Sequence, residues 1–302
     1  MEPAMSAKAL VLAALFPLAG AETLSIHPPK PAPIHPWVEA CKDWDEWDKA
    51  GPPFKVHGNT WYVGTCGISA LLITGPKGHV LIDSGTEQGA EVVLANVSRL
   101  GFKPRDIKVL LSSHEHFDHV GGMARLQQAT GAKVLASTVA ASVLRTGKDS
   151  ADDPQSGMHK PMRPVAKVGL LREGQVVRVG PLALTPIFTP GHTPGATSWR
   201  WQSCEGADCK TIAFADSLSP ISRDDYRFSG HPAYLAAFQR SADRVEAIGC
   251  DILIAPHPSA SSMRAQLQGG GLASPGGRPC EAHARTVRAN LKVRLIKEGR
   301  AQ

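Results

Sequence analysis

A short run of six residues places four candidate metal ligands, three histidines and one aspartate, close together, and this limits what the chain can fold into. The run consists of His114, Glu115, His116, Phe117, Asp118 and His119. It directly follows residues 107–111, a stretch typical of a buried strand. Folds of the α/β class place their sites at the carboxyl ends of strands. His114 and His116 project to one side of an extended segment, and a turn at Phe117 redirects the next two donors, so the run predicts two adjacent metal positions.

Two further histidines follow other predicted strands. His192 lies in a Gly-His-Thr-Pro-Gly loop after a strand that ends at residue 188, and His257 lies in a Pro-His-Pro loop after a strand that ends at residue 255. The flanking Pro and Gly restrict the loop backbone, which suits holding an imidazole in one place. A catalytic zinc site takes three protein ligands and leaves a position for water. The two histidines therefore complete two sets of three donors.

Strand and helix patterns alternate along the chain and predict an α/β fold. The predicted strands span residues 60–63, 68–73, 79–82, 107–111, 133–136, 176–179, 182–188, 197–201, 211–214 and 251–255. The predicted helices span residues 90–100, 123–128, 137–145, 233–248 and 281–297, and residues 259–277 are predicted to be a loop. Two mixed β-sheets with helices outside give a four-layer αββα sandwich.

The N-terminus has the pattern of an export signal. Lys8 precedes an apolar run at residues 9–16, and Ala19, Gly20 and Ala21 provide the small residues that a signal peptidase requires. The run is too short to span a membrane. We expect residues 1–21 to be a signal peptide and residues 22–302 to form a single domain in the periplasm. No coiled-coil heptad is present, so a monomer is expected by default.

Six cysteines in an exported chain are compatible with three disulfide bonds, although the sequence leaves the pairing open. Two cysteines bracket a turn-like insert between strand patterns, two would join a late strand to the last helix, and the remaining two would tie the N-terminal segment to the first sheet. These favoured pairs are Cys204–Cys209, Cys250–Cys280 and Cys41–Cys66. A thiolate metal site is the alternative, but no Cys-x-x-Cys spacing occurs.

Together these motifs resemble those of the metallo-β-lactamase superfamily. The similarity rests on the H-x-H-x-D-H run, on residues 81–85 (LIDSG) upstream and on His192 and His257 downstream, and it covers nearly the whole mature chain. The chain is most similar to class B β-lactamases of subclass 3, because residues 215–219 (ADSLS) contain no cysteine where other subclasses place a thiolate ligand. The resemblance implies the metallo-β-lactamase fold and antibiotic resistance through hydrolysis of penicillins, cephalosporins and carbapenems by a metal-bound hydroxide.

The resemblance also implies a role for each motif residue. One zinc ion would be held by His114, His116 and His192, and a second by Asp118, His119 and His257. Asp118 would also be catalytic, because it would hold the attacking hydroxide. Asp83 would stiffen the ligand loop, and Ser217 and Ser219 would face the substrate carboxylate. Gln155 lies in the polar loop 152–160, which we expect to overhang the site and contact the substrate.

Two alternatives remain open. Another hydrolase of the superfamily, such as a glyoxalase-II-like thioesterase or a lactonase, would bridge its metals with a carboxylate near Asp216. The place of Asp216 relative to the donors tests this. A nucleic-acid-processing member is favoured only by the net charge of +6, the pI of about 9.1 and the basic helix at 281–297. Glu281 and Glu298 flank that helix and export separates it from nucleic acid, so we expect a small β-lactam substrate and neither a nucleic-acid nor a membrane partner.

Overall fold

Seven strands pair into a mixed β-sheet around the donor run. The computed structural model describes Met1 and residues 33–273 and 276–300. The strands are β1 (Phe54–His57), β2 (Thr60–Tyr62), β3 (Leu71–Ile73), β4 (His79–Ile82), β5 (Ile107–Leu111), β6 (Lys133–Ala136) and β7 (Val168–Leu170). They lie in chain order, with β1 to β4 antiparallel and β4 to β7 parallel. The strands β1 to β4 thus form a meander, and helices connect the parallel strands from β4 to β7.

A second mixed sheet follows. Its strands are β8 (Val177–Val179), β9 (Leu182–Phe188), β10 (Thr197–Glu205), β11 (Asp208–Phe214) and β12 (Ile252–Ile254). The order in space is β12-β11-β10-β9-β8, in which β11 and β12 are parallel and the other pairs antiparallel. Therefore β9, β11 and β12 run in the same direction and end at the same edge of the sheet.

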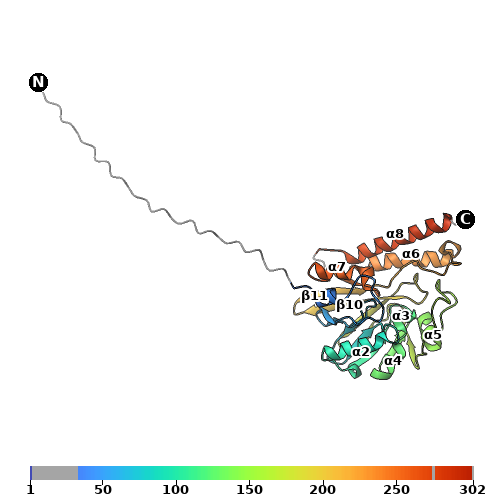
Figure 1. Cartoon of the computed structure of the whole chain (residues 1–302), viewed down its shortest axis with the longest axis horizontal. Coiled ribbons are helices and arrows are strands. Elements are labelled where there is room, and N and C mark those ends of the chain that lie inside the picture. The colour runs from blue at the N-terminus through green and yellow to red at the C-terminus, as the bar shows by residue number, and fades with distance from the viewer. Residues whose placement is uncertain (2–32, 274–275, 301–302) are drawn as a thin grey trace. The chain divides into compact units, whose positions relative to one another are not determined.

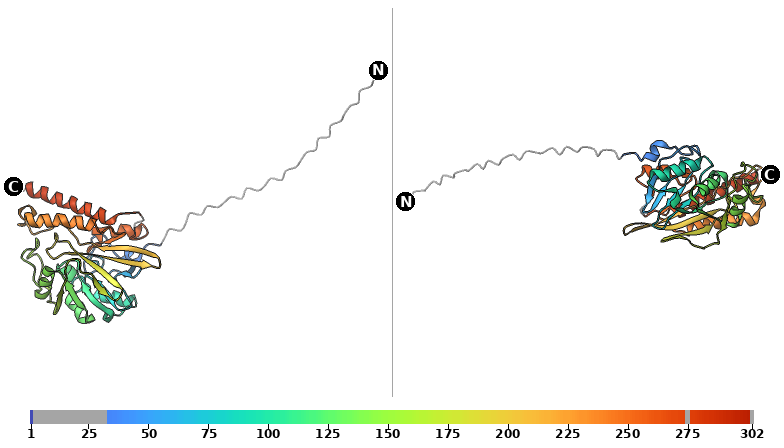
Figure 2. Two further views of the ribbon diagram at one scale, coloured as in Figure 1. Left: turned by 180° about the vertical axis from the view of Figure 1, so that it is seen from behind. Right: turned by 90° about the horizontal axis from the view of Figure 1, so that it is seen from below.

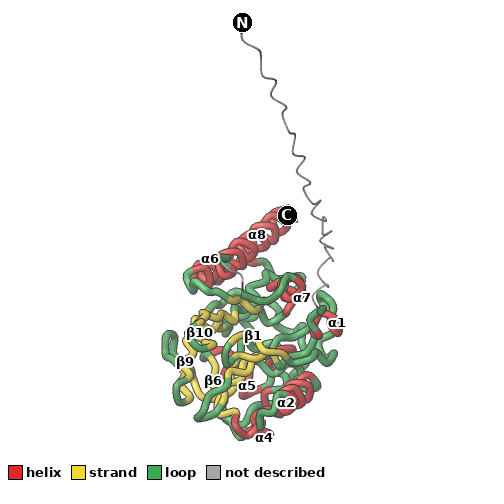
Figure 3. Tube along the Cα trace, turned by 90° about the vertical axis from the view of Figure 1, so that its left-hand side faces the viewer, coloured by secondary structure: helices red, strands yellow, loops and turns green. Residues whose placement is uncertain are grey.

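Helices cover the outer faces of both sheets. The α-helices are α1 (Pro36–Ala40), α2 (Gly89–Arg99), α3 (Phe117–Val120), α4 (Met123–Thr130), α5 (Thr138–Thr146), α6 (Pro232–Glu246), α7 (Met263–Gln268) and α8 (Pro279–Arg300). Figure 1 shows α6 and α8 on one side of the strands and α2, α4 and α5 on the other. The view from behind in Figure 2 and the side view in Figure 3 show the same order of layers. The predicted four-layer arrangement is confirmed.

Three apolar clusters hold the layers together. Leu71 and Ile73 of β3 enter the cluster between the two sheets, whereas Leu72 enters the cluster beneath α2, α4 and α5. This alternation follows from the pleat of a strand. The third cluster packs α6 and α8 against the second sheet and includes Phe238 and Leu291, as the helical spacing of their apolar residues predicts.

Residues at both ends of α5, the helix that follows β6, explain where this helix begins and ends. Ser137 precedes α5 and is its N-cap, because its side chain accepts a hydrogen bond from Ala140 N. The helix ends at Gly147, whose φ of 71° is the left-handed conformation that glycine adopts most easily. The backbone beyond Gly147 leads into the loop that overhangs the donor run.

Some elements differ from the sequence prediction. The loop predicted at 259–277 contains α7 and a short 3-10 helix at Pro258–Ser261, so the prediction is wrong there. Met263 and Leu267 of α7 are buried in the cluster between the sheets. The edge strands β1 and β7 and the short helices α1 and α3 were not predicted. They are three to five residues long and gain their stability from tertiary packing rather than from local propensity.

All six cysteines form disulfide bonds in the structure. The pairs are Cys41–Cys66, Cys204–Cys209 and Cys250–Cys280, which is the pairing that the sequence favoured. The second pair lies across the β10–β11 hairpin, where Cys204 and Cys209 are in register.

The part of the chain from Ile34 to Gln302 forms one compact unit. Apart from Met1, the expected signal peptide lies outside the described residues. None of the helices in the described part combines the length and apolar character that a bilayer crossing requires.

Candidate metal centre

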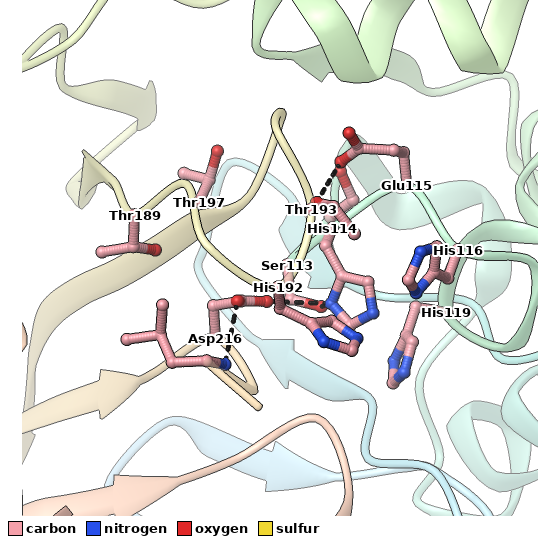
Figure 4. Close-up of polar contacts among 12 residues, drawn as sticks. Ser113, His114, Glu115, His116, His119, Thr189, His192, Thr193, Thr197 and Asp216 are labelled. Carbon is pink, nitrogen blue, oxygen red and sulfur yellow. Dashed lines mark hydrogen bonds and ion pairs between the residues drawn. The ribbon is translucent and has the colours of Figure 1, made fainter. Parts of the chain in front are cut away.

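Strand ends bring the predicted donors together. The donor run follows β5, His192 follows β9, and His257 follows β12. Single ligand atoms of His114, His116 and His192 lie within 4.8 Å of one another, as do those of His114, Asp118 and His119. Figure 4 shows the four labelled imidazoles of this centre turned towards one another. Of these four, only His192 comes from a distant loop, which the fold brings beside the donor run.

The second predicted set also converges. Oδ2 of Asp118 lies 3.0 Å from Nε2 of His119 and 3.4 Å from Nε2 of His257. The two imidazole nitrogens are themselves 3.3 Å apart. Asp118 and His119 are buried, whereas the His257 side chain is 20% exposed and lines the opening. All six donors predicted from the sequence therefore meet at one centre.

In each imidazole, the ring nitrogen that faces away from the centre contacts an oxygen atom of a neighbouring residue. The contacts are His114 Nδ1 with Asp216 Oδ1 (2.8 Å), His116 Nε2 with Asp153 Oδ2 (3.0 Å), His119 Nδ1 with Asp83 Oδ2 (3.4 Å), His192 Nδ1 with Ser219 O (3.0 Å) and His257 Nδ1 with Gly67 O (3.3 Å). Such contacts fix ring orientation and the protonated nitrogen, and they leave the opposite nitrogen free to bind a metal. Among the described residues, the buried Nε2 of His114 has no hydrogen-bond partner, which fits a site built for a cation.

Asp83 fastens both ends of the donor run. Its carboxylate accepts hydrogen bonds from the main-chain N (2.6 Å) and the hydroxyl (2.7 Å) of Ser113, and it contacts His119 at the other end. The neighbouring Ser84 donates its main-chain N–H to His119 O (2.8 Å). Asp83 adopts a φ of 62°, a conformation that Asp tolerates better than most residues. The LIDSG segment thus holds the loop that supplies four donors.

The electrostatics of the centre favour the metal-binding protonation states of His114, Asp118 and His257, whereas they favour the protonated form of His119. Burial and the neighbouring His119 hold the pKa of His114 well below its usual range, and burial lowers the pKa of His257 to about 4. Burial opposes ionisation of Asp118, but His119 and His257 outweigh it and hold the Asp118 pKa well below its ordinary value. Asp118 and Asp83 likewise outweigh burial at His119 and raise its pKa to about 10. Metal binding would therefore displace a proton from His119.

An open cleft of about 250 Å³ leads to the donors. The residues that line it, apart from the donors, are Trp44, Trp47, Gln155, His159, Ser217, Ser219, Ile221 and Ala260. They include Gln155, Ser217 and Ser219, the three side chains predicted from the sequence to contact the substrate. The hydroxyl of Ser219 also lies 2.9 Å from Nδ1 of His192, and the buried hydroxyl of Ser217 has no hydrogen-bond partner in the described part of the chain.

Several cleft residues were not predicted from the sequence. Trp44 and Trp47 are 72% and 40% exposed, and both rings lie beside His257. Trp44 has a φ of 53°, which is strained for so large a residue, and its N–H donates to Ser259 Oγ. The ring of His159 lies tilted beside those of His116 and Phe117, while Asp153 contacts His116. The sequence feature that could have indicated them is the polar loop 152–160, because it contains both His159 and Asp153.

The family comparison agrees with this geometry. Residues 63–257 match the family model described as the metallo-beta-lactamase superfamily, a span that contains all six donors. The chain belongs to the metallo-β-lactamase superfamily.

Solved structures of metallo-β-lactamases are similar to this chain over most of its length. The MIM-2 metallo-β-lactamase is 53% identical, with a TM-score of 0.82, and the match covers 87% of this chain and 97% of that one. MEM-A1, a subclass B3 metallo-β-lactamase isolated from a soil metagenome library, is 40% identical with a TM-score of 0.81, and the match covers 85% of this chain and all of that one. The resemblance to subclass 3 is confirmed by these relatives.

Other relatives of known activity are less similar in sequence and match a smaller part of the chain. The hydroxyacylglutathione hydrolase of Rhodopseudomonas palustris (strain BisB18) is 29% identical over 152 residues, which is 48% of this chain and 48% of the hydrolase. The chain spans about half the length, or less, of such curated relatives. The names of these relatives show that proteins similar to this chain also include hydrolases of other substrates.

Asp216 lies behind the metallo-β-lactamase donors rather than between them. Its side chain is fully buried, with Oδ1 against His114 Nδ1 and Oδ2 accepting a hydrogen bond from Leu218 N (3.2 Å). Its own N–H donates to Ser198 Oγ (2.9 Å). In Figure 4 this carboxylate lies on the far side of His114 from His116 and His119. Both oxygens are therefore engaged away from the point where the two donor sets meet.

Proposed function

We propose that the protein is a zinc-dependent β-lactamase that hydrolyses the amide bond of the β-lactam ring. The observation that carries the proposal is the meeting of five imidazoles and one carboxylate in two sets beneath an open cleft. The identity of 53% with a metallo-β-lactamase supports the substrate class. Penicillins, cephalosporins and carbapenems are the proposed substrates.

Zinc fits this donor set, because catalytic zinc sites combine neutral imidazoles with a carboxylate and leave a position for water. We assign His114, His116 and His192 to one ion and Asp118, His119 and His257 to the other. Bound zinc supplies Lewis acidity, which lowers the pKa of water towards neutrality and polarises a carbonyl oxygen.

The chain itself orients the reactants. The ionised carboxylate of Asp118 accepts a hydrogen bond from the attacking water and aligns it. The hydroxyls of Ser217 and Ser219 and the amide of Gln155 line the cleft, where they donate hydrogen bonds to the substrate carboxylate. No cysteine acts as nucleophile, since all six are in disulfides.

Thioester hydrolysis is the second candidate, and the match to a hydroxyacylglutathione hydrolase favours it. This alternative requires a bridging carboxylate near Asp216. The contacts of Asp216 with His114 and Leu218 argue against that role. A lactonase would require the same bridging group, so the same contacts weigh against it.

A substrate panel tests the proposal. The purified protein is assayed spectrophotometrically with a carbapenem, a cephalosporin, a glutathione thioester and a lactone at equal concentrations. We expect turnover of the two β-lactams at rates far above those of the thioester and the lactone. Turnover of the thioester alone would contradict the β-lactamase function while leaving the metal centre intact.

We also propose that the protein is exported to the periplasm and matures at Glu22 as a single-domain monomer. Three disulfide bonds in a chain of this size are typical of an oxidising compartment. N-terminal sequencing of the protein from a periplasmic fraction is expected to begin at Glu22. Recovery of the uncleaved chain from the cytoplasm would contradict export.

A further inference from the structure

Glu115 is a buried carboxylate for which the proposed function assigns no role. It lies between His114 and His116, and it is 2% exposed. Figure 4 shows its carboxylate directed to Thr193 rather than to the imidazoles. No Lys or Arg within residues 33–273 or 276–299 forms an ion pair with it. Burial of an ionisable group costs free energy unless specific partners compensate, so the partners of Glu115 indicate its purpose.

Both oxygens of Glu115 bind the loop that carries His192. Oε2 accepts a hydrogen bond from Thr193 Oγ1 at 2.7 Å, and Oε1 accepts one from the main-chain N of Gly195 at 2.8 Å. A Cβ at position 195 would lie 2.7 Å from both oxygens, so glycine is required there. One carboxylate thus links segments that are 78 to 80 residues apart in the sequence.

This link joins the two segments that supply the three-histidine set. Glu115 is the residue between two of these histidines, and Thr193 directly follows the third. A main-chain hydrogen bond from Thr197 N to Ser113 O (2.6 Å) ties the same segments nearby. The contact of His192 with Ser219 fixes the rotation of its ring, whereas Glu115 fixes the loop on which that ring is carried.

We propose that Glu115 is a positioning residue that sets the separation between His192 and the His114–His116 pair, and so raises the affinity of that metal position. The inference rests on the proposed metal function. Without Glu115 the loop at 191–195 would have to be ordered by the metal, which lowers affinity by the cost of that ordering. The other set has no member in this loop, so its affinity is expected to persist.

The test measures metal affinity rather than activity. Metal-free protein is titrated with Co²⁺ against a chromophoric chelator, which yields two stepwise affinities, and unfolding temperature is measured in parallel. We expect Glu115→Gln to weaken one affinity roughly 10- to 100-fold and Thr193→Val to weaken it roughly tenfold. Thr193→Ser keeps the hydroxyl and is expected to match the wild type. Glu87→Gln, at a partly exposed carboxylate paired with Arg125, is the control and is also expected to match.

Two results would overturn the proposal. The first is a folded Glu115→Gln protein in which both metal affinities equal those of the wild type. If Glu115→Gln does not fold, unchanged metal affinities in Thr193→Val would overturn the proposal instead. The second is equal weakening of both affinities together with a lower unfolding temperature, which would indicate a general structural role. A wild-type protein that takes up no second ion would refute the proposed metal function itself, before any variant is compared.

Discussion

At the scale of single residues, the centre depends on polar groups that hold the imidazoles from behind. Asp153 binds Nε2 of His116 and also caps its own turn by accepting a hydrogen bond from Gln155 N (2.7 Å). Arg223 donates to Asp153 O (3.3 Å) and so holds the turn from the other side. One buried carboxylate thus fixes both a proposed metal ligand and Gln155, which lines the cleft.

Replacement of Asp153 tests this arrangement. In Asp153→Ala the imidazole of His116 loses its orienting partner, so we expect the affinity for one zinc ion to fall roughly 10- to 100-fold. The KM for a carbapenem is expected to rise as well, because Gln155 loses its cap. Asp152→Ala removes an exposed neighbouring carboxylate and is expected to behave as wild type. Equal metal affinities in the two variants would contradict the role of Asp153.

At the scale of elements, α8 is fastened at both ends. The Cys250–Cys280 bond anchors its first turn. Near its last turn, Glu298 accepts hydrogen bonds from Phe228 N, Ser229 N and Arg294 Nε at 2.8 to 3.0 Å. Burial opposes ionisation of Glu298, but these partners outweigh it and lower its pKa to about 2.

Acid unfolding tests the contribution of Glu298. Because its folded pKa is lowered, its stabilisation is full above the ordinary value near 4.5 and is lost as the pH falls towards 2. We expect Glu298→Gln to reduce the free energy of unfolding by about 1–3 kcal/mol at pH 7, and the difference from wild type to shrink below pH 4. Glu281→Gln, which removes an exposed pair with Arg278, is expected to cost less than about 1 kcal/mol. A pH-independent difference in denaturant titrations would contradict the assignment.

A second prediction concerns the segment that forms one wall of the cleft. The Cys41–Cys66 bond ties the residues around Trp44 and Trp47 to the first sheet. Replacing both cysteines by serine is expected to raise KM roughly fivefold, about 1 kcal/mol of binding energy, with kcat little changed. The same replacement at Cys204 and Cys209, in a hairpin that does not line the cleft, is expected to leave KM unchanged. A fall in kcat without a change in KM would contradict this account.

At the scale of the whole molecule, two sheets bring together loops that are distant in the sequence. The six donors were predictable because each signal is local: a dense run after a strand, and two histidines between Gly or Pro at strand exits. Asp153 and Glu115 were not predictable, because their partners lie 37 and about 80 residues away and only folding defines them. Helix α7 was missed since its stability comes from contacts such as those of Arg264 with Val38 O and Cys41 O.

The proposed function requires two zinc ions, held by the two donor sets, for β-lactam hydrolysis. The most direct measurement follows metal content and carbapenem hydrolysis in the same sample during exhaustive chelation and stepwise return of zinc. We predict two zinc ions per chain, loss of hydrolysis on chelation, and recovery as zinc is restored. Hydrolysis that persists in metal-free protein would contradict the account.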